Sequence, residues 1–490
     1  MIAINLMLLI PLMGMLFFVF FGRLKISGAI NILFSIATFI DSLFLAIHLL
    51  KNGPILCLGK QIYIDALSVI LIVLTTFVSS TVAIFSSNYM RQNLDSGRIT
   101  AKLLQLYYIM FQAFIGTVLL VYATNNIGLL WVAMEGATLA TVLLVSLYRT
   151  PESIEAAWKY FILCIVGIAL ALFGTICIYF SSIKLPITAD AAMLWTVLHQ
   201  HAALLDPHVL TIGFVFLLVG YGTKVGLVPL HFWLPDAHSE SPAPMSALLS
   251  GLLLNIGVYA LIRFKMLIDP GLSNQLTNNM LLAFGFVSFL IAGFFIYRQK
   301  NIKRMFSYSS IEHMGLITFA FGLNTPLTSF IGLFYVIIHS LVKSAIFMSV
   351  GNVIQLVKNQ NMDKIRGLIQ LKPIVGWTLL FGLIAIAGFP PFGIFNSEFL
   401  LFIASTQKNI LFSILLILGL LIAMAGLFKN LHPVLFGKNT DEELPTTKVC
   451  TLPSVLNLSI ALYLGLHIPH VLMLLLNQAT VAIAGGGITL

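Results

Sequence analysis

Residues 218–264 read LVGYGTKVGLVPLHFWLPDAHSESPAPMSALLSGLLLNIGVYALIRF, and the rest of the chain is organised around them. Lys224 lies in an apolar run that is long enough to reach deep into a bilayer, and Gly226, Pro229 and Pro235 then interrupt the helix. A lysine at the bilayer centre costs about 2.5 to 3.5 kcal/mol on insertion scales, and irregular backbone at that depth persists only where protein or water satisfies it. The stretch therefore predicts a broken helix that lines a wet, buried ion path. The alternative is a lysine near a helix end whose ammonium group reaches the headgroups.

The composition is that of a polytopic membrane protein. Of the 490 residues, 59% are hydrophobic and 9% are charged, and the mean hydropathy is +1.02. These values exclude a soluble domain of any size and predict an all-α membrane fold. A net charge of +9 is compatible with nucleic acid, but membrane orientation explains it better. We therefore expect the lipid bilayer, and no nucleic acid, as a partner.

The four cysteines are Cys57, Cys164, Cys177 and Cys450, and they form no CxxC or Cys/His spacing. The sequence therefore predicts no iron–sulfur cluster, no zinc site, no disulfide framework and no cofactor. Any redox chemistry that the protein serves is expected to take place in another subunit. Residues 1–21 have no basic n-region and no small-residue cleavage site, which predicts a retained first span.

Apolar runs of about 20 residues, bounded by charges or turn residues, predict fourteen transmembrane helices. The expected ranges are 2–21, 27–50, 64–87, 103–123, 126–148, 157–181, 209–229, 242–266, 279–298, 304–323, 327–356, 373–406, 409–435 and 453–476. The seventh and twelfth are expected to be interrupted. Thr150, Pro151 and Glu152 support the start of the sixth, because threonine caps, proline suits the first turn, and an acidic side chain suits the positive helix end.

The basic residues test the helix count, because they divide unevenly between the two sets of loops. Seventeen border the loops after odd-numbered helices: Arg23, Lys25, Arg91, Arg98, Lys102, Arg149, Arg298, Lys300, Lys303, Arg304, Lys358, Lys364, Arg366, Lys372, Lys429, Lys438 and Lys448. Six border the other loops: Lys51, Lys60, Lys184, Arg263, Lys265 and Lys408. Lys159, Lys224 and Lys343 remain inside spans. The positive-inside rule therefore predicts an inner (cytoplasmic) membrane protein with cytoplasmic odd-numbered loops and both termini in the periplasm.

A weak internal repeat is visible. Lys159 and Lys343 are each followed by a glycine eight residues later, and the helix breaks at 226–229 and 388–391 correspond to each other. Inverted repeats that meet at broken helices are typical of transporters, although chance similarity between two apolar stretches is the alternative. The expected division is an N-terminal three-helix segment (1–102), a first five-helix repeat with helices 4 to 8 (103–270), a second with helices 9 to 13 (271–436), and helix 14 with the tail (437–490).

Ionisable residues are rare in the interior of the predicted spans, away from their ends: the acidic ones are Asp41, Glu135, Glu312 and Glu398, and against these stand Lys159, Lys224 and Lys343. Tyr335, His339 and Lys343 recur every four residues and so share one helix face. His313 lies four residues after Ser309 and gives a shorter polar stripe. A lone membrane histidine more often makes a helix–helix hydrogen bond. Three titratable side chains in line indicate a proton relay instead. Asp41 and His48 fit helix-packing or interface positions better.

The chemistry that such a path requires is modest. Burial disfavours the charged form of a lysine, and an approaching carboxylate favours it. Glu135 paired with Lys224 would hold the lysine protonated, and separating the two would release the proton to the next site. Water must bridge the gaps, because these groups lie on different helices.

Several motifs resemble one family. They are WVAMEG (131–136), TKVGLVPLHFWLPDAHSESPAP (223–244), NIKRMFSYSSIEHMG (301–315), HSLVKSAIFMSVG (339–351) and GFPPFGIFNSEF (388–399). They are similar to the antiporter-like subunits of respiratory complex I and of Mrp sodium/proton antiporters. Their amino-acid sequences most resemble component F of hydrogenase-4. The resemblance runs from about residue 103 to residue 436. It implies that Glu135 is the fifth-helix glutamate, Lys224 and Lys343 the seventh- and eleventh-helix lysines, and Glu398 the twelfth-helix exit residue.

Asn255 departs from the family pattern, because many relatives place a lysine there. The relay between the two halves is then expected to use His238, His313 or water. The expected proton path is therefore Glu135, Lys224, His238, His313, His339, Lys343 and Glu398, with Lys159, Asn255 and Tyr335 as secondary positions. The chain is also expected to lack the long lateral helix that some relatives carry.

Two functions remain open at this stage. The first is a proton-translocating subunit of a complex I-related NADH–quinone oxidoreductase or a membrane-bound hydrogenase, with other membrane subunits as partners. The second is an Mrp-like cation/proton antiporter or an inorganic-carbon-uptake module without a redox arm, for which sodium is the alternative ion. A purely structural scaffold would not require four buried charged residues. The sequence does not identify the parent complex, its electron donor and acceptor, the ion, or the direction of transport.

Overall fold

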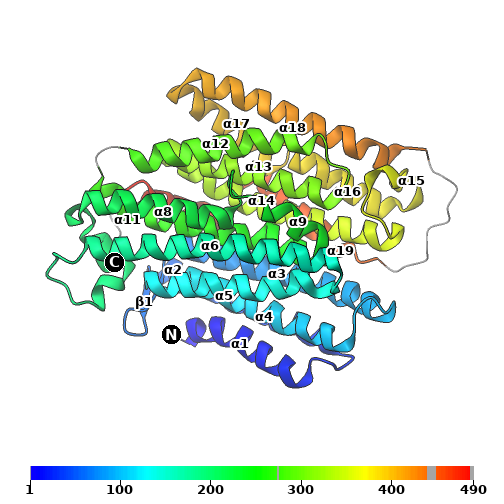
Figure 1. Ribbon diagram of the computed structural model, residues 1–490, viewed down its shortest axis with the longest axis horizontal. Helices are drawn as coiled ribbons and strands as arrows, with labels where there is room; N and C mark the ends of the chain where they lie inside the picture. Colours follow the sequence, from blue (N-terminus) through cyan, green and yellow to red (C-terminus); the bar gives the residue numbers. More distant parts are fainter. Residues whose placement is uncertain (1, 273–274, 439–448, 486–490) are drawn as a thin grey trace.

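The computed structural model describes residues 2–272, 275–438 and 449–485. Its helices run roughly parallel, with α1 (Ile2–Phe21) along one side of the bundle and α18 (Ile410–Phe436) along the other (Figure 1). Strand β1 (Ile55–Cys57) lies at one end of the bundle and α15 (Leu368–Leu371) lies at the opposite end. The long helix axes therefore share one direction, as expected for a protein that crosses a membrane many times.

The first part of the chain alternates long helices with short connections. The elements are α1, α2 (Ser27–Asn52), β1, β2 (Ile62–Ile64), α3 (Ala66–Asp95), α4 (Ala101–Ala123), α5 (Ile127–Val145), α6 (Pro151–Ser181), α7 (Trp195–Gln200), α8 (Pro207–Val225), α9 (Trp233–Glu240), α10 (Ala243–Leu248) and α11 (Leu254–Ile268). Strands β1 and β2 form an antiparallel hairpin in which Ile55 is paired with Ile64. A π-helical turn, Leu249–Leu253, joins α10 to α11.

The second part continues with α12 (Leu276–Ile296), α13 (Ile302–Leu323), α14 (Pro326–Val357), α15, α16 (Pro373–Ile386), α17 (Gly393–Lys408), α18, α19 (Leu452–Leu466) and α20 (His470–Ile483). Short 3₁₀ turns lie at Ser146–Tyr148, Ala191–Met193, Ala202–Leu204, Asp269–Gly271 and Met362–Lys364.

Capping side chains fix several helix starts. Thr150 accepts a hydrogen bond of 3.1 Å from the Ser153 amide, and Pro151 occupies the first turn of α6 as predicted. Asn126 caps α5 and Thr325 caps α14 in the same way. Each cap satisfies an amide that the helix itself leaves free.

Both predicted helix interruptions are present. Helix α8 ends at Gly226, whose φ is +81°, and α16 is followed by Gly388, whose φ is +68°. Glycine reaches this left-handed region without the penalty that a β-carbon brings. A third break was not predicted: α19 and α20 meet at an angle of 74°. The hydropathy of the run 453–476 does not report backbone direction, and the Gly465 and Pro469 that lie at this bend were not used in the prediction.

Each of the fourteen expected ranges contains a helix or a broken pair of helices. Ten helices of the described chain are long and apolar enough to cross a membrane, or eleven if the bent pair α19 and α20 forms one span. The protein is thus a multi-pass membrane protein, and the count of fourteen spans stays a prediction.

Burial identifies the helices at the centre of the bundle. The most apolar window of Ala243–Gly271 is 100% buried and that of α14 is 94% buried, whereas that of α18 is only 33% buried. Helices α10, α11 and α14 are therefore enclosed by protein, and α18 faces the surroundings. Polar groups on α11 and α14 are therefore shielded from lipid. A proton path requires such a shielded position inside the protein.

Candidate functional site

The break after α8 positions Lys224. This lysine is the last residue but one of α8 and is fully buried. The chain turns back at Gly226, and the indole of Trp233 at the start of α9 donates to the Thr223 carbonyl at 2.9 Å. The ammonium group is therefore held at the end of a helix, where the free carbonyl groups favour a cation.

Two neighbouring helices, α5 and α6, supply the surroundings of Lys224. Its ammonium group donates to the Thr138 hydroxyl of α5 and lies 5.6 Å from the centre of the Tyr160 ring of α6. The Tyr160 hydroxyl in turn lies 2.7 Å from the Thr141 hydroxyl. Lys224 thus contacts polar and aromatic groups without touching a carboxylate in the described residues.

Glu135 lies one helical turn before Thr138 on α5 and is partly buried. It attracts Lys224 electrostatically, but its Oε2 atom is buried and has no hydrogen-bond partner within the described residues. The expected pair of Glu135 and Lys224 is therefore not in direct contact in this structure. The Thr138 hydroxyl occupies the position beside the ammonium group.

Lys343 is the corresponding lysine of the second half. It lies in the middle of α14, is fully buried, and donates to the Phe306 carbonyl of α13 at 2.9 Å. Glu312, also on α13, attracts it electrostatically. Like Lys224, it makes no ion pair within 4.0 Å in the parts of the chain that the structure describes.

Tyr335, which lies on α14 two turns before Lys343, belongs to a continuous chain of hydrogen bonds. The Tyr335 hydroxyl donates to Glu398 of α17 at 2.9 Å and lies 2.5 Å from Nδ1 of His313 on α13. Because the single Tyr335 proton points at Glu398, Nδ1 of His313 must donate to the Tyr335 oxygen. Glu398, Tyr335 and His313 therefore form one hydrogen-bonded chain that joins three helices.

His339 lies between this hydrogen-bonded chain and Lys343 on the same face of α14. It lies one turn from each of Tyr335 and Lys343, and its ring centre is 5.7 Å from that of His313. Both ring nitrogens of His339 are buried and have no hydrogen-bond partner among the described residues. Buried polar atoms of this kind call for bridging water.

His238 and Asn255 both contact α14. His238 of α9 is fully buried and stacks on Phe347 of α14, with ring centres 4.6 Å apart. The Asn255 amide of α11 donates to the Ser340 hydroxyl of α14 and to the Gly251 carbonyl, each at 2.8 Å. Both predicted linkers therefore contact the helix that carries Lys343.

Lys159 is not buried as expected. Its side chain is 49% exposed and pairs with Glu155 at 2.7 Å and with Asp236 of α9 at 3.2 Å. Asp236 also pairs with Arg304 of α13 at 3.1 Å. Helix α6 begins earlier than the range 157–181 suggested, which places Lys159 beside this surface cluster and away from the buried relay.

Three polar residues near the path were absent from the expected set. Thr138 gave no sequence signal, because a threonine in a membrane helix usually bonds to its own backbone. Glu312 is inside a predicted span and is buried, and that signal was available. Lys303 was assigned to a loop, yet it is buried and donates to the Ser241 carbonyl at 2.5 Å.

Comparisons with known proteins place this arrangement in a family. Residues 124–423 match the family model described as NADH:quinone oxidoreductase/Mrp antiporter, TM, and residues 58–98 match that of the N-terminus of complex I chain 5. The chain is 44% identical over 462 residues to the hydrogenase-4 component F homolog of Methylacidiphilum infernorum, a match that covers 94% of this chain and 96% of that protein.

Two solved structures share the fold. One is a chain of the membrane-bound sulfane sulfur reductase, an archaeal respiratory membrane complex, with a TM-score of 0.88, 23% identity, and coverage of 98% of this chain and 97% of that chain. The other is a chain of the Mrp complex from Dietzia sp. DQ12-45-1b, with a TM-score of 0.84, 16% identity, and the same coverage. The chain therefore belongs to the NADH:quinone oxidoreductase/Mrp antiporter transmembrane family and is related to hydrogenase-4 component F.

Proposed function

We propose that this chain is the proton-translocating, antiporter-like subunit of a multi-subunit membrane complex with a redox arm. The observation that carries the proposal is the hydrogen-bonded relay from His313 through Tyr335 to Glu398, which lies two turns from the buried Lys343. A structural helix contact does not require four titratable groups in line at this depth.

Lys224 and Glu135 form the switch at the start of the path. When the Glu135 carboxylate approaches, it stabilises the ammonium form of Lys224, and when it withdraws, burial favours release of the proton. In the arrangement described here, the Thr138 hydroxyl contacts the ammonium group and the carboxylate does not. This arrangement corresponds to the separated state of the switch.

The proton then passes from the first half to the second. His238 is the protein group that bridges the two, since it lies on the connection after the break and interacts electrostatically with Lys343. Lys343 receives the proton and passes it along its own helix face to His339. His313, Tyr335 and Glu398 complete the transfer, with water filling the remaining gaps.

The inverted arrangement of two five-helix units, 103–270 and 271–436, flanked by segments 1–102 and 437–490, is part of this proposal. So is the orientation, with the loop 358–372 in the cytoplasm and the two ends of the chain in the periplasm. Met1, Leu490 and Lys448 lie outside the described residues.

Other membrane subunits are the expected partners. The solved chains of similar fold belong to an archaeal respiratory membrane complex and to an Mrp complex. Attachment to a redox arm is favoured by the 44% identity to a hydrogenase-4 component F homolog. Operation as an Mrp-like cation/proton antiporter is the alternative, because the family description covers both kinds of protein.

Proton pumping by the assembled complex in reconstituted vesicles tests the proposal. Lys224→Arg should abolish pumping while leaving assembly intact, because arginine keeps its proton and cannot relay it. Glu135→Gln should do the same, because it removes the carboxylate that stabilises the ammonium form of Lys224. Full pumping by either variant, normalised to assembled complex, would reduce both residues to structural groups. Pumping that requires sodium, measured by uptake of radioactive sodium, would favour the antiporter alternative.

A further inference from the structure

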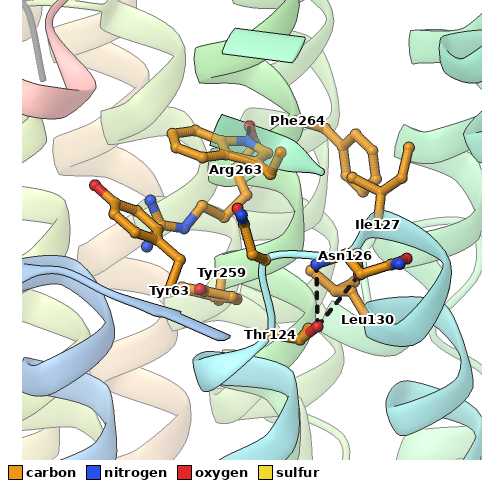
Figure 2. A pocket seen from close by; sticks show the side chains of 10 residues that line it. Tyr63, Thr124, Asn126, Ile127, Leu130, Tyr259, Arg263 and Phe264 are labelled. Carbon is orange, nitrogen blue, oxygen red and sulfur yellow. Dashed lines mark hydrogen bonds between the residues drawn. The ribbon is translucent and has the colours of Figure 1, made fainter. Parts of the chain in front are cut away.

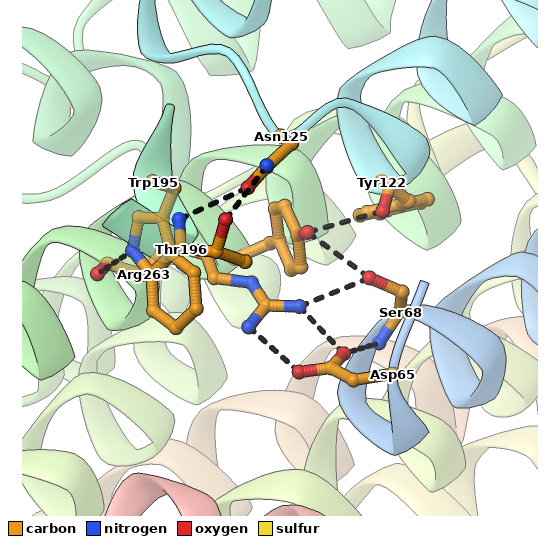
Figure 3. Close-up of polar contacts among 8 residues, drawn as sticks. Asp65, Ser68, Tyr122, Asn125, Trp195, Thr196 and Arg263 are labelled. Carbon is orange, nitrogen blue, oxygen red and sulfur yellow. Dashed lines mark hydrogen bonds and ion pairs between the residues drawn. The ribbon is translucent and has the colours of Figure 1, made fainter. Parts of the chain in front are cut away.

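A second set of buried charges lies at the end of the bundle where β1 lies. Arg263 of α11 donates to both carboxylate oxygens of Asp65, at 2.8 and 2.5 Å, and Asp65 caps α3 (Figure 3). The guanidinium carbon lies 5.7 Å from the ring centre of Tyr63, 4.8 Å from that of Trp195 and 5.0 Å from that of Tyr259. The sequence had suggested that Arg263 borders a loop, but its side chain is only 4% exposed.

Helix α11 connects this pair to the centre of the protein. Asn255, Tyr259 and Arg263 recur every four residues and therefore share one face of the helix. The Asn255 amide contacts the Ser340 hydroxyl, which lies one turn from Lys343 on α14. The Asn255 Oδ1 atom is buried and has no hydrogen-bond partner within the described chain.

Asn255, Tyr259 and Arg263 form the α11 stripe. Its part from Tyr259 to Arg263 is hydrogen-bonded without interruption. The Tyr259 hydroxyl donates to the Tyr122 carbonyl at 3.1 Å and lies 3.1 Å from the Ser68 hydroxyl. Arg263 donates to the same Ser68 hydroxyl at 3.0 Å (Figure 3). A pocket of about 10 Å³, enough for one water, lies beside Tyr259 and Arg263, between these side chains and the loop 124–126 (Figure 2).

A larger hollow lies next to the ion pair. It has a volume of about 450 Å³ and is bounded by Tyr63, Asp65 and Ala66 at the start of α3 and by Asn477 and Gln478 of α20. Its volume is sufficient for several water molecules. The Asp65 side chain therefore separates this hollow from the polar stripe.

The directions of the hydrogen bonds show why the stripe is closed in this arrangement. The Tyr259 proton points at the Tyr122 carbonyl, so the Ser68 hydroxyl must donate to Tyr259 while it accepts from Arg263. Arginine cannot give up its proton at physiological pH, so of the pair only Asp65 can accept one. Burial alone would raise the pKa of Asp65, but the facing guanidinium and its hydrogen bonds outweigh burial and keep the pKa below its ordinary value.

We propose that the α11 stripe is an outlet through which protons leave the central relay, and that the Asp65–Arg263 pair is the plug that closes it. When Arg263 withdraws, the Ser68 hydroxyl is free to turn toward Asp65. A proton that reaches Tyr259 from water beside Asn255 then moves to Ser68 and on to the Asp65 carboxylate, each hydroxyl accepting one proton and giving one. Asp65 releases the proton to water in the hollow. The inference rests on the proposed function, since it requires protons at Lys343.

Passive proton leak tests the outlet separately from pumping. The assembled complex is reconstituted into vesicles that carry a potassium gradient, valinomycin and an internal pH dye, without redox substrate. Arg263→Gln should raise the leak by at least about tenfold, because the plug is gone. Adding Tyr259→Phe should return the leak to the wild-type rate. Adding Tyr122→Phe, the control, should leave it high, because phenylalanine keeps the ring that packs on Tyr259 and the stripe bonds to the Tyr122 backbone carbonyl.

An assembled Arg263→Gln complex without extra leak would overturn the outlet, and so would a leak that persists in the Tyr259→Phe double variant. A second measurement keeps the native pair intact, in case Arg263→Gln does not assemble. Ala66→Cys, in a chain whose four cysteines are replaced by serine, should react with a membrane-impermeant thiol reagent, because Ala66 lines the hollow. A folded protein that does not react also overturns the proposal. Pumping by Lys224→Arg, by contrast, would contradict the proposed function and leave the leak result standing.

Discussion

Lys224 shows how a single hydroxyl can control a buried charge. Its ammonium group has no carboxylate in contact among the described residues, and it donates a hydrogen bond to the Thr138 hydroxyl. Thr138 lies one turn from Glu135, so the hydroxyl lies on the way between acid and base. A hydrogen bond to a charged group contributes about 1.5 to 3 kcal/mol, and its loss inside a membrane is not replaced by water. In the proposed switch, an uncharged residue is therefore the group that holds the ammonium in place.

Thr138→Val keeps the shape of the side chain and removes the hydroxyl, so the proton affinity of Lys224 should fall. We expect proton pumping to drop by roughly tenfold, as a loss of about 1.4 kcal/mol implies, while the complex assembles normally. Thr318→Val is the matched control, because the Thr318 hydroxyl is also buried and donates to the Met314 carbonyl of its own helix. Equal pumping by the two variants would remove Thr138 from the path.

Tyr335, like Thr138, carries a single hydroxyl on which the proposed proton transfer depends. Tyr335→Phe keeps the ring and separates His313 from Glu398, so proton transfer should slow by roughly 100-fold, the low end of what a positioned proton donor contributes. Tyr107→Phe removes another buried hydroxyl, on α4, and should have no effect. The measurement is the pumping rate per assembled complex. An unchanged rate in Tyr335→Phe would mean that water bypasses the tyrosine.

At the scale of elements, the two broken helices differ in what surrounds their glycines. A β-carbon added at Gly226 would find its nearest neighbour, a Leu234 methyl carbon, at 3.5 Å, which is an ordinary contact. A β-carbon added at Gly388 would overlap the Glu398 carboxylate. The first break thus requires glycine for its backbone alone, and the second also requires it to admit an acidic side chain.

Gly388→Ala should therefore displace Glu398 from Tyr335 and abolish pumping, in addition to the cost of about 1 to 2 kcal/mol for a left-handed alanine. Gly226→Ala bears the same backbone cost without the overlap, and should lower thermal stability with a smaller loss of pumping. Thermal unfolding and pumping of both variants separate the two effects. A similar loss of pumping in both would show that backbone strain alone is responsible.

The elements were predictable from the sequence and most of their contacts were not. Gly226 and Gly388 followed by proline predicted both interruptions, because the chemistry of these residues is local. Gly465 and Pro469 mark the bend between α19 and α20 in the same way, and the expected range 453–476 overlooked them. The burial of Lys303 and Arg263, by contrast, depends on neighbours distant in sequence. The stripe of Tyr335, His339 and Lys343 was predictable from helical spacing. The contact between Lys224 of α8 and Thr138 of α5 was not predictable, because a one-dimensional pattern does not specify which helices are adjacent.

At the scale of the whole molecule, charge sets the orientation. Arg263, Lys265 and Lys303 are buried, so they do not contribute to the balance of exposed basic residues. Removing them from both sides leaves the excess on the odd-numbered loops intact. The positive-inside rule therefore still predicts that these loops, including 358–372, face the cytoplasm.

Cysteine labelling in oriented membranes measures this orientation. A cysteine at Lys364 should be protected from an impermeant thiol reagent added from the periplasmic side, and a cysteine at Lys60, in the hairpin connection, should react. Both side chains are exposed, so accessibility depends on the side of the membrane alone. The reverse pattern would exchange the inlet and the outlet of the path.

Helix α14 has 32 residues and no interruption, which at about 1.5 Å per residue makes it roughly 48 Å long, well beyond the roughly 30 Å of a hydrocarbon core. Tyr335, His339 and Lys343 all lie on this one unbroken helix, so the spacing of their backbone positions is constant. A change in the distances between groups of the proposed path must then come from partners on other helices, among them His238 on α9 and Glu398 on α17, which follow the two breaks. The unbroken helix therefore sets the distances along the proposed path, and movement of the interrupted helices would determine when a proton is transferred.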